Sequence, residues 1–164
     1  MEDIVIKYKK ASYERDEDIL RLCRYIAGEC DSKKEVTRYC CGAGVSTDPN
    51  KAARQMIKLQ KLYRKEVQRH GKNTCRRIYH YIVSFSQSMA DANSVKMAAM
   101  DIAEIFSGQY QVYYGIHEDT KDLHVHYAIN AVSYVDGKKW HKNRREIQEM
   151  EMQIREKGKA AWLY

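Results

Sequence analysis

Apolar positions in the first part of the chain repeat with two different periods. Residues 3–9 alternate weakly and predict a first strand, and residues 36–45 are rich in strand-forming types. Residues 14–28 predict an amphipathic helix, because apolar side chains recur at helical spacing and Gly28 follows them as a stop signal. The apolar stripe of this helix consists of Ile19, Leu22, Cys23, Ile26 and Ala27. Tyr25 falls off the stripe, so we expect its hydroxyl to lie outside the core.

Capping signals mark the next helices. Asp48 is expected to be an N-cap, with Pro49 at the first helical position, and Gly71 is expected to end the helix that they open. The core face of this helix is predicted to be Ala52, Met56, Leu59, Tyr63 and Val67. A further helix is expected over residues 91–106, with Asp91 at its start.

Strand signals dominate the middle of the chain and the region after residue 108. Residues 77–85 predict a strand that turns His80 to one face and bulky side chains to the other. Residues 109–117 and 123–135 predict two more strands, and an Asp-Gly turn signal after them predicts a hairpin to a third run at residues 138–141.

The chain is predicted to close with a charged helical tail over residues 143–158, in which Ile147, Met150 and Ile154 recur at helical spacing. Helices and strands therefore alternate first, and neighbouring strands follow. This order predicts an α+β fold, with a mostly antiparallel central β-sheet flanked by helices. Residues 1–164 are expected to form a single domain.

Composition narrows the class of protein. The 164 residues are 44% hydrophobic, which is enough for a self-sufficient core and excludes intrinsic disorder. No apolar run approaches the roughly 18 residues of a membrane span, and the first residues lack a signal peptide, so we expect a cytoplasmic protein. The five cysteines show no C-x-x-C spacing and are interpreted as reduced thiols without a function of their own.

Charge and aromatic content point toward a polyanionic partner. The formal charge is +7, and the chain contains 13 tyrosines. Such a surface can bind a phosphate backbone and stack on bases, although a solvated basic face and core tyrosines explain the same numbers. We expect Lys138, Lys139, Arg144 and Arg145 to contact the phosphate backbone of a nucleic acid, with plain solvation as the alternative.

Three histidines lie within ten residues and are candidate metal ligands. His124 and His126 are two apart on a predicted strand, so their rings project from one face. His117 ends the preceding strand, and a six-residue link can pair it opposite His124. Three convergent imidazoles make a metal site with open coordination positions, as in catalytic sites. Asp119 is expected to hold a ligand histidine, although an Asp in a link is equally a turn residue.

A metal in a basic domain suits phosphoryl transfer on nucleic acid, since it neutralises charge while a nucleophile attacks phosphorus. The nucleophile is either metal-bound water or a side chain that forms a covalent intermediate. Tyr25 is the candidate side chain because its helix turns the apolar stripe away from it. Tyr13 and Tyr39 are its rivals.

The stretch from His117 to Asn130 resembles the metal-binding motif H-x-D-x₄-H-x-H of the HUH endonucleases, in particular the relaxases that mobilise plasmids and conjugative elements. The segments LCRYIAGE, YHYIVSF and SYVDGKKWH resemble recurring segments of that family in the same order, so the resemblance covers residues 4–145. Relaxases usually continue with further helices and a second domain, which suggests a catalytic fragment or a minimal member here.

The resemblance implies a specific activity. A tyrosine at the position of Tyr25 would attack one phosphodiester of single-stranded DNA at a transfer origin, which links it to the 5′ phosphate and leaves a 3′ hydroxyl. His117, His124 and His126 would hold Mg²⁺ or Mn²⁺, and Asp119 would orient a histidine. Accessory mobilisation proteins are possible partners. Two alternatives stay open: a hydrolytic nuclease that uses activated water, and a non-catalytic DNA-binding accessory protein.

Overall fold

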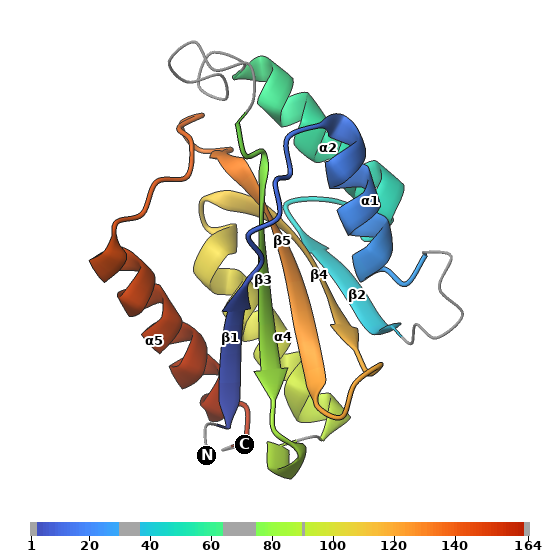
Figure 1. The fold of residues 1–164 in the computed structure, drawn as a ribbon, viewed down its shortest axis with the longest axis vertical. Helices are drawn as coiled ribbons and strands as arrows, with labels where there is room; N and C mark the ends of the chain where they lie inside the picture. The colour runs from blue at the N-terminus through green and yellow to red at the C-terminus, as the bar shows by residue number, and fades with distance from the viewer. Residues whose placement is uncertain (1–2, 30–36, 64–74, 90, 163–164) are drawn as a thin grey trace.

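Five strands form one sheet through the middle of the molecule (Figure 1). The computed structural model describes residues 3–29, 37–63, 75–89 and 91–162. The strand order across the sheet is β1-β3-β5-β4-β2, and every neighbouring pair is antiparallel. The strand bounds are Ile4–Tyr8 for β1, Thr37–Ala43 for β2, Ile78–Phe85 for β3, Tyr110–His117 for β4 and Leu123–Ser133 for β5. The predicted α+β architecture is confirmed.

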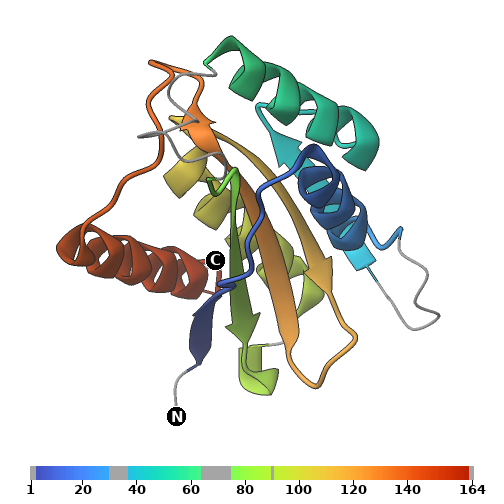
Figure 2. The same ribbon diagram turned by 45° about the horizontal axis from the view of Figure 1, so that its top comes forward.

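Helices cover both faces of this sheet (Figures 1 and 2). The pair α1 and α2 packs on one face, beside β4, and the pair α4 and α5 packs on the other. No helix in the described ranges has the length and apolar character to cross a membrane. The helix bounds are Asp16–Ile26 for α1, Pro49–Leu62 for α2, Ala92–Ser107 for α4 and Arg144–Ala160 for α5, with a 3₁₀ turn at Gln87–Met89.

The two faces hold cores of different size. The larger core joins α4 and α5 to the odd-numbered residues of β3 and β5, such as Phe85 and Tyr127. The smaller core joins α1 and α2 to the sheet, and on β3 and β5 it reaches Ile78 and Ala128. Strand residues two positions apart share a face. The next residues on the smaller-core face are therefore His80 on β3 and His126 on β5, so a polar site begins where the apolar cover ends.

Most predicted elements are present, with one error. Residues 138–141 form no strand, because only Lys139 pairs, in an isolated bridge with Val132. The reason lies in the residues on either side of that bridge. Trp140 buries its ring against Tyr110, at a centroid distance of 5.0 Å, and Asn143 already caps α5. Too few residues remain for a ladder. The predicted end of α2 at Gly71 lies outside the described residues, as does Val67 of its predicted core face.

A glycine lets α1 approach β4 closely. A Cβ atom built on Gly115 would lie 2.6 Å from the backbone oxygen of Ile26 and 2.9 Å from its Cγ2. Both distances are shorter than a Cβ atom can tolerate, and the contact with the oxygen of Ile26 can be relieved only by movement of the backbone. Any side chain at position 115 would therefore push away the end of α1, where Tyr25 lies.

We expect Gly115→Ala to lower the free energy of unfolding by about 1–3 kcal/mol, as overpacked sites do. Urea denaturation of the metal-free protein measures this change. Gly108→Ala is the matched control, since nothing lies within 4 Å of its added methyl group and its φ is −65°. A Gly115→Ala protein as stable as the Gly108→Ala protein would show that α1 does not depend on this contact.

Candidate metal centre

Three histidines converge at the paired ends of β4 and β5. The register sets His117 opposite His124, as predicted, and His126 opposite Gly115. One nitrogen from each of the three rings lies within 4.8 Å of the other two, and all three side chains are buried. The ring centroids of His117 and His126 are 4.4 Å apart, and those of His124 and His126 are 5.1 Å apart. This spacing allows one cation to be shared.

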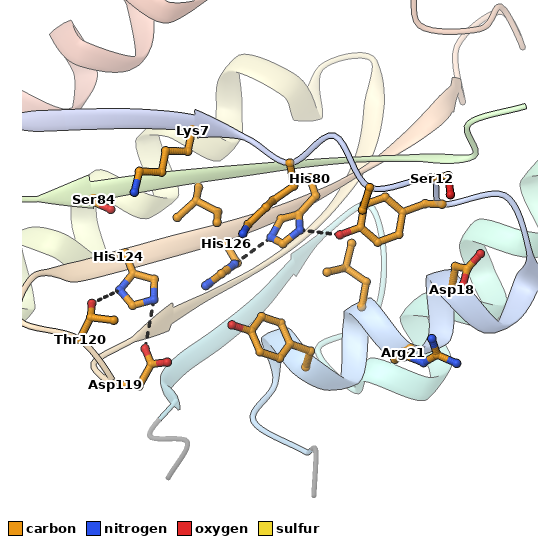
Figure 3. A pocket seen from close by; sticks show the side chains of 16 residues that line it. Lys7, Ser12, Asp18, Arg21, His80, Ser84, Asp119, Thr120, His124 and His126 are labelled. Atoms are coloured by element: carbon orange, nitrogen blue, oxygen red, sulfur yellow. Dashed lines mark hydrogen bonds and ion pairs between the residues drawn. The ribbon is translucent and has the colours of Figure 1, made fainter. Parts of the chain in front are cut away.

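Hydrogen bonds orient two of these rings. The Nε2 of His117 lies 3.0 Å from the carbonyl oxygen of Ile26. A carbonyl only accepts, so this nitrogen carries the hydrogen and Nδ1 keeps a lone pair. By the same rule, Nδ1 of His124 donates to the carbonyl of Asp122 at 3.0 Å. The Nε2 of His124 lies 3.1 Å from Oδ1 of Asp119 (Figure 3). The carboxylate of Asp119 thus lies at the ring nitrogen of His124 that is left for a cation.

His126 is the ring that a cation fits best. Its Nδ1 is 2.8 Å from Nε2 of His80, and its Nε2 is buried without a hydrogen-bond partner among the described residues. An unsatisfied buried polar atom costs about 1–3 kcal/mol. A metal ion would remove that cost, since the orphaned nitrogen is one of three imidazole donors around one point. The residues present therefore fit a bound divalent metal.

Burial keeps the inner rings neutral. Desolvation, and next the charge of His117, lower the pKa of His126 to about 2. Desolvation, Lys9 and His117 lower the pKa of His80 to about 4. Both rings therefore stay unprotonated at neutral pH, and each keeps a lone pair.

The ring of Tyr25 lies beside two of the three histidines. Its ring centroid lies 5.1 Å from that of His117 and 5.1 Å from that of His126, and the side chain is half-buried. Tyr13 lies at the edge of the same site, where its hydroxyl is 2.9 Å from Nδ1 of His80. The ring of Tyr39 instead packs toward the larger core, 6.4 Å from that of Tyr114. The structure therefore brings two of the three candidate tyrosines to the site.

A pocket of about 790 Å³ opens in front of these rings, and its lining includes Tyr13, Tyr25, His80, Asp119, His124 and His126. Figure 3 shows His80 and His126 between Lys7 of β1 and Arg21 of α1, and His124 beside Asp119. Lys9 also lines it, and all three cationic side chains are exposed. A cleft with cations at its rim and imidazoles at its floor suits a polyanion that reaches a metal.

Comparison with known proteins identifies the family. The family model of the relaxase nuclease domain, MobA/VirD2-like, matches residues 25–160. The chain belongs to this relaxase family. No curated protein sequence is significantly similar to it.

Solved structures show the same fold. The MobM relaxase domain (MOBV; Mob_Pre) bound to plasmid pMV158 oriT DNA of 22 nucleotides, with Mn, superposes with a TM-score of 0.62 at 12% identity; the match covers 97% of this chain and 86% of that chain. A structure of that domain with 26 nucleotides of oriT DNA gives a TM-score of 0.58 at 12% identity, over 97% and 87% of the two chains. At such identities the likeness establishes the fold alone.

Some predicted site residues of this relaxase domain lie elsewhere. Lys138, Lys139, Arg144 and Arg145 do not line the pocket, because they follow the far end of β5 from His124. Arg145 instead pairs with Glu149 at 3.0 Å. Their contact with DNA stays a prediction.

Other pocket residues escaped the sequence analysis. Lys7 lies in β1 and Lys9 just after it, two residues apart, and this alternation is a signal that could have found them. Arg21, by contrast, is one basic residue among many on helical surfaces. Asn130, which follows on the histidine face, is fully buried and satisfied by Gln60 and Gln111, away from the pocket.

The neutral rings predict acid sensitivity of the metal-free relaxase domain. A histidine titrates near about pH 6.5 when unfolded. Below that pH the two histidines bind protons in the unfolded chain, whereas buried His80 and His126 stay unprotonated in the folded protein. The free energy of unfolding is therefore highest above about pH 6.5, and it falls as the pH drops toward the pKa values of the folded protein. Each ring contributes up to about 1.4 kcal/mol per pH unit. Urea denaturation in chelator between about pH 7 and about pH 5 measures the slope.

His80→Gln should make this pH dependence shallower by up to one proton, because glutamine does not titrate. His141→Gln is the matched control, since His141 is exposed and lies outside the pocket. Equal slopes for the wild type and for His80→Gln would contradict the assignment.

Proposed function

We propose that this relaxase domain nicks and rejoins single-stranded DNA at the transfer origin of a mobile element, through Tyr25 and a divalent metal. The observation that carries the proposal is the tyrosine ring 5.1 Å from two of three convergent histidines, at a pocket with a cationic rim. The MobM relaxase domain, bound to oriT DNA and Mn, supplies the substrate class. We also propose the cytoplasm as the compartment, since such DNA is found there.

The proposed metal ligands are His117, His124 and His126, and the ion is Mg²⁺ or Mn²⁺. When bound, the ion polarises a phosphoryl oxygen and offsets the charge that develops during attack. Mg²⁺ prefers oxygen ligands, so an all-imidazole set suits Mn²⁺ better, while the carboxylate of Asp119 beside His124 supplies an oxygen for either ion. Asp119 is therefore proposed as a catalytic residue that acts through its carboxylate beside the metal.

The chemistry of the chain itself is a transesterification. The phenol oxygen of Tyr25 loses its proton and forms a bond to phosphorus, while the bond from phosphorus to the 3′ oxygen breaks. The 3′ oxygen takes up a proton and leaves as a hydroxyl. One phosphodiester replaces another, so little free energy is lost and a 3′ hydroxyl can reverse the step. Lys7, Lys9 and Arg21 are proposed to hold neighbouring phosphates at the rim.

The first experiment looks for the covalent intermediate. Single-stranded oligonucleotides that span a candidate origin, labelled at the 3′ end, are incubated with the protein and Mn²⁺ or chelator. We expect a metal-dependent protein–DNA adduct on a denaturing gel with the wild type, and none with Tyr25→Phe or His124→Ala. His124→Ala should also abolish stabilisation of the protein by Mn²⁺.

Tyr39→Phe is the matched control, because it removes a tyrosine hydroxyl outside the pocket, and it should form the adduct as the wild type does. Cleavage without an adduct, unchanged in Tyr25→Phe, would identify a hydrolytic nuclease instead. Binding without cleavage in any metal would identify an accessory DNA-binding protein.

A second experiment tests the phosphate contacts proposed for the cationic side chains at the rim of the pocket. Fluorescence anisotropy with a single-stranded oligonucleotide over a series of salt concentrations gives the slope of log affinity against log salt. Each lost phosphate contact should reduce this slope by about 0.7. We expect that reduction for Arg21→Gln and Lys9→Gln. Arg145→Gln removes an equally exposed cation outside the pocket and tests the DNA contact predicted for residues 138–145. An unchanged slope for both rim variants would disprove the proposed path of the DNA.

A further inference from the structure

A row of three hydrogen-bonding side chains lies behind the proposed metal site. Tyr13 Oη is 2.9 Å from Nδ1 of His80, and Nε2 of His80 is 2.8 Å from Nδ1 of His126 (Figure 3). The three groups come from the segment after β1, from β3 and from β5. His80 and His126 are 3% exposed, so water does not compete for these bonds.

The fold fixes each member of this row. His80 pairs with Ala128 and His126 pairs with Ile82, so the two histidines are diagonal neighbours on adjacent strands. Tyr13 is held beside the start of β3, since its backbone oxygen accepts a hydrogen bond of 2.7 Å from the amide of Arg77. The row therefore spans backbone segments that the sheet already holds together.

The hydrogens of the row can run in only two directions. In the first, Nδ1 of His126 donates to His80, Nδ1 of His80 donates to the oxygen of Tyr13, and Nε2 of His126 keeps a lone pair. In the second, Tyr13 donates to His80, His80 donates to His126, and Nε2 of His126 carries a hydrogen. That hydrogen would be buried without an acceptor among the described residues, and it would block a metal.

We infer that His80 and Tyr13 are positioning residues for the metal site, and that they hold His126 in the tautomer whose Nε2 lone pair faces the metal. This inference rests on the proposed function only in requiring that the three histidines bind a divalent ion. Partners that fix the tautomer and orientation of a ligand histidine raise the affinity for the metal.

The inference gives the two tyrosines of the pocket different roles. The hydroxyl of Tyr13 is engaged with His80, and its ring is 6.0 Å from that of His80. The ring of Tyr25 contacts those of His117 and His126 directly. Tyr13 therefore acts on metal binding, and Tyr25 acts on DNA.

Calorimetric titration of the purified protein with Mn²⁺ tests this division without any DNA. We expect His80→Phe, which keeps an aromatic ring but offers no acceptor, to weaken Mn²⁺ binding by about 10- to 100-fold. His80→Gln places an acceptor oxygen near the lost Nε2 and should restore most of the affinity. Tyr13→Phe should weaken binding by about 2- to 10-fold, as expected for one neutral hydrogen bond.

Tyr25→Phe is the matched control, because it also removes one tyrosine hydroxyl from the pocket and should bind Mn²⁺ as the wild type does. In the adduct assay Tyr25→Phe becomes the more severely impaired variant. Tyr13→Phe should still form the adduct at a higher Mn²⁺ concentration, and Tyr25→Phe should form none. Thermal unfolding in chelator shows whether each variant folds. If His80→Phe does not fold, the titration of Tyr13→Phe still tests the inference.

The outcomes separate this inference from the proposed function. A wild type that does not bind Mn²⁺ would remove the metal site itself. If the wild type binds Mn²⁺ and the Tyr13→Phe and His80→Phe proteins bind it with the same affinity, the positioning roles would be overturned and the metal site would stand. Heteronuclear NMR of histidine-labelled protein with diamagnetic Zn²⁺ gives a further measurement: we expect the hydrogen of His126 on Nδ1, and a hydrogen on Nε2 would contradict the inference.

Discussion

The pairing of β4 with β5 in one register is the constraint on which the site depends. It sets His117 against His124 and brings His126 beside them. Side chains alternate between the two faces of a strand, so a slip of one residue would turn the histidines of β5 into the larger core and bring apolar side chains to the pocket. Such a slip would bury imidazoles among rings such as those of Phe106 and Tyr114, where they would find few partners. The apolar pattern of the sheet thus fixes the metal site as well as the fold.

The unequal cover of the two faces explains how a polar site exists in so small a domain. The α4 and α5 face supplies most of the apolar burial. On the other face, α1 and α2 cover only part of the sheet, and the remaining positions can be polar provided that their nitrogens are satisfied. Several of them are, through Ile26, Asp122 and His80. Nε2 of His126, which has no hydrogen-bond partner among the described residues, lies where the other two imidazoles converge.

Much of this arrangement could be predicted from the sequence, and the errors have physical causes. Alternation along a strand is a strict rule, so the common face of His124 and His126 and their approach to His117 followed from spacing alone. The family motif added a role for Tyr25. Residues 138–141 look like a strand by composition, but burial of Trp140 in the larger core directs the chain away from the sheet.

Proximity in sequence was the less reliable guide. Lys138 and Arg145 follow the histidine strand closely in the chain, yet β5 rises about 3.3 Å with every residue and carries them to the opposite end of the sheet. His80 reaches the site from β3 and Lys9 from the residues just after β1, and both precede the histidines of β4 and β5 by many residues. Only the strand order β1-β3-β5 places them there, and local patterns do not encode that order.

The hydrogen bond from His117 to the carbonyl of Ile26 has a consequence for the proposed reaction. Ile26 is the residue after Tyr25, so the backbone at the proposed nucleophile is tethered to a ring of the candidate metal centre. DNA attached to Tyr25 in that reaction would stay at the place where it was cut. A returning 3′ end would then need to find one fixed point, and closure of the strand would become a short-range event.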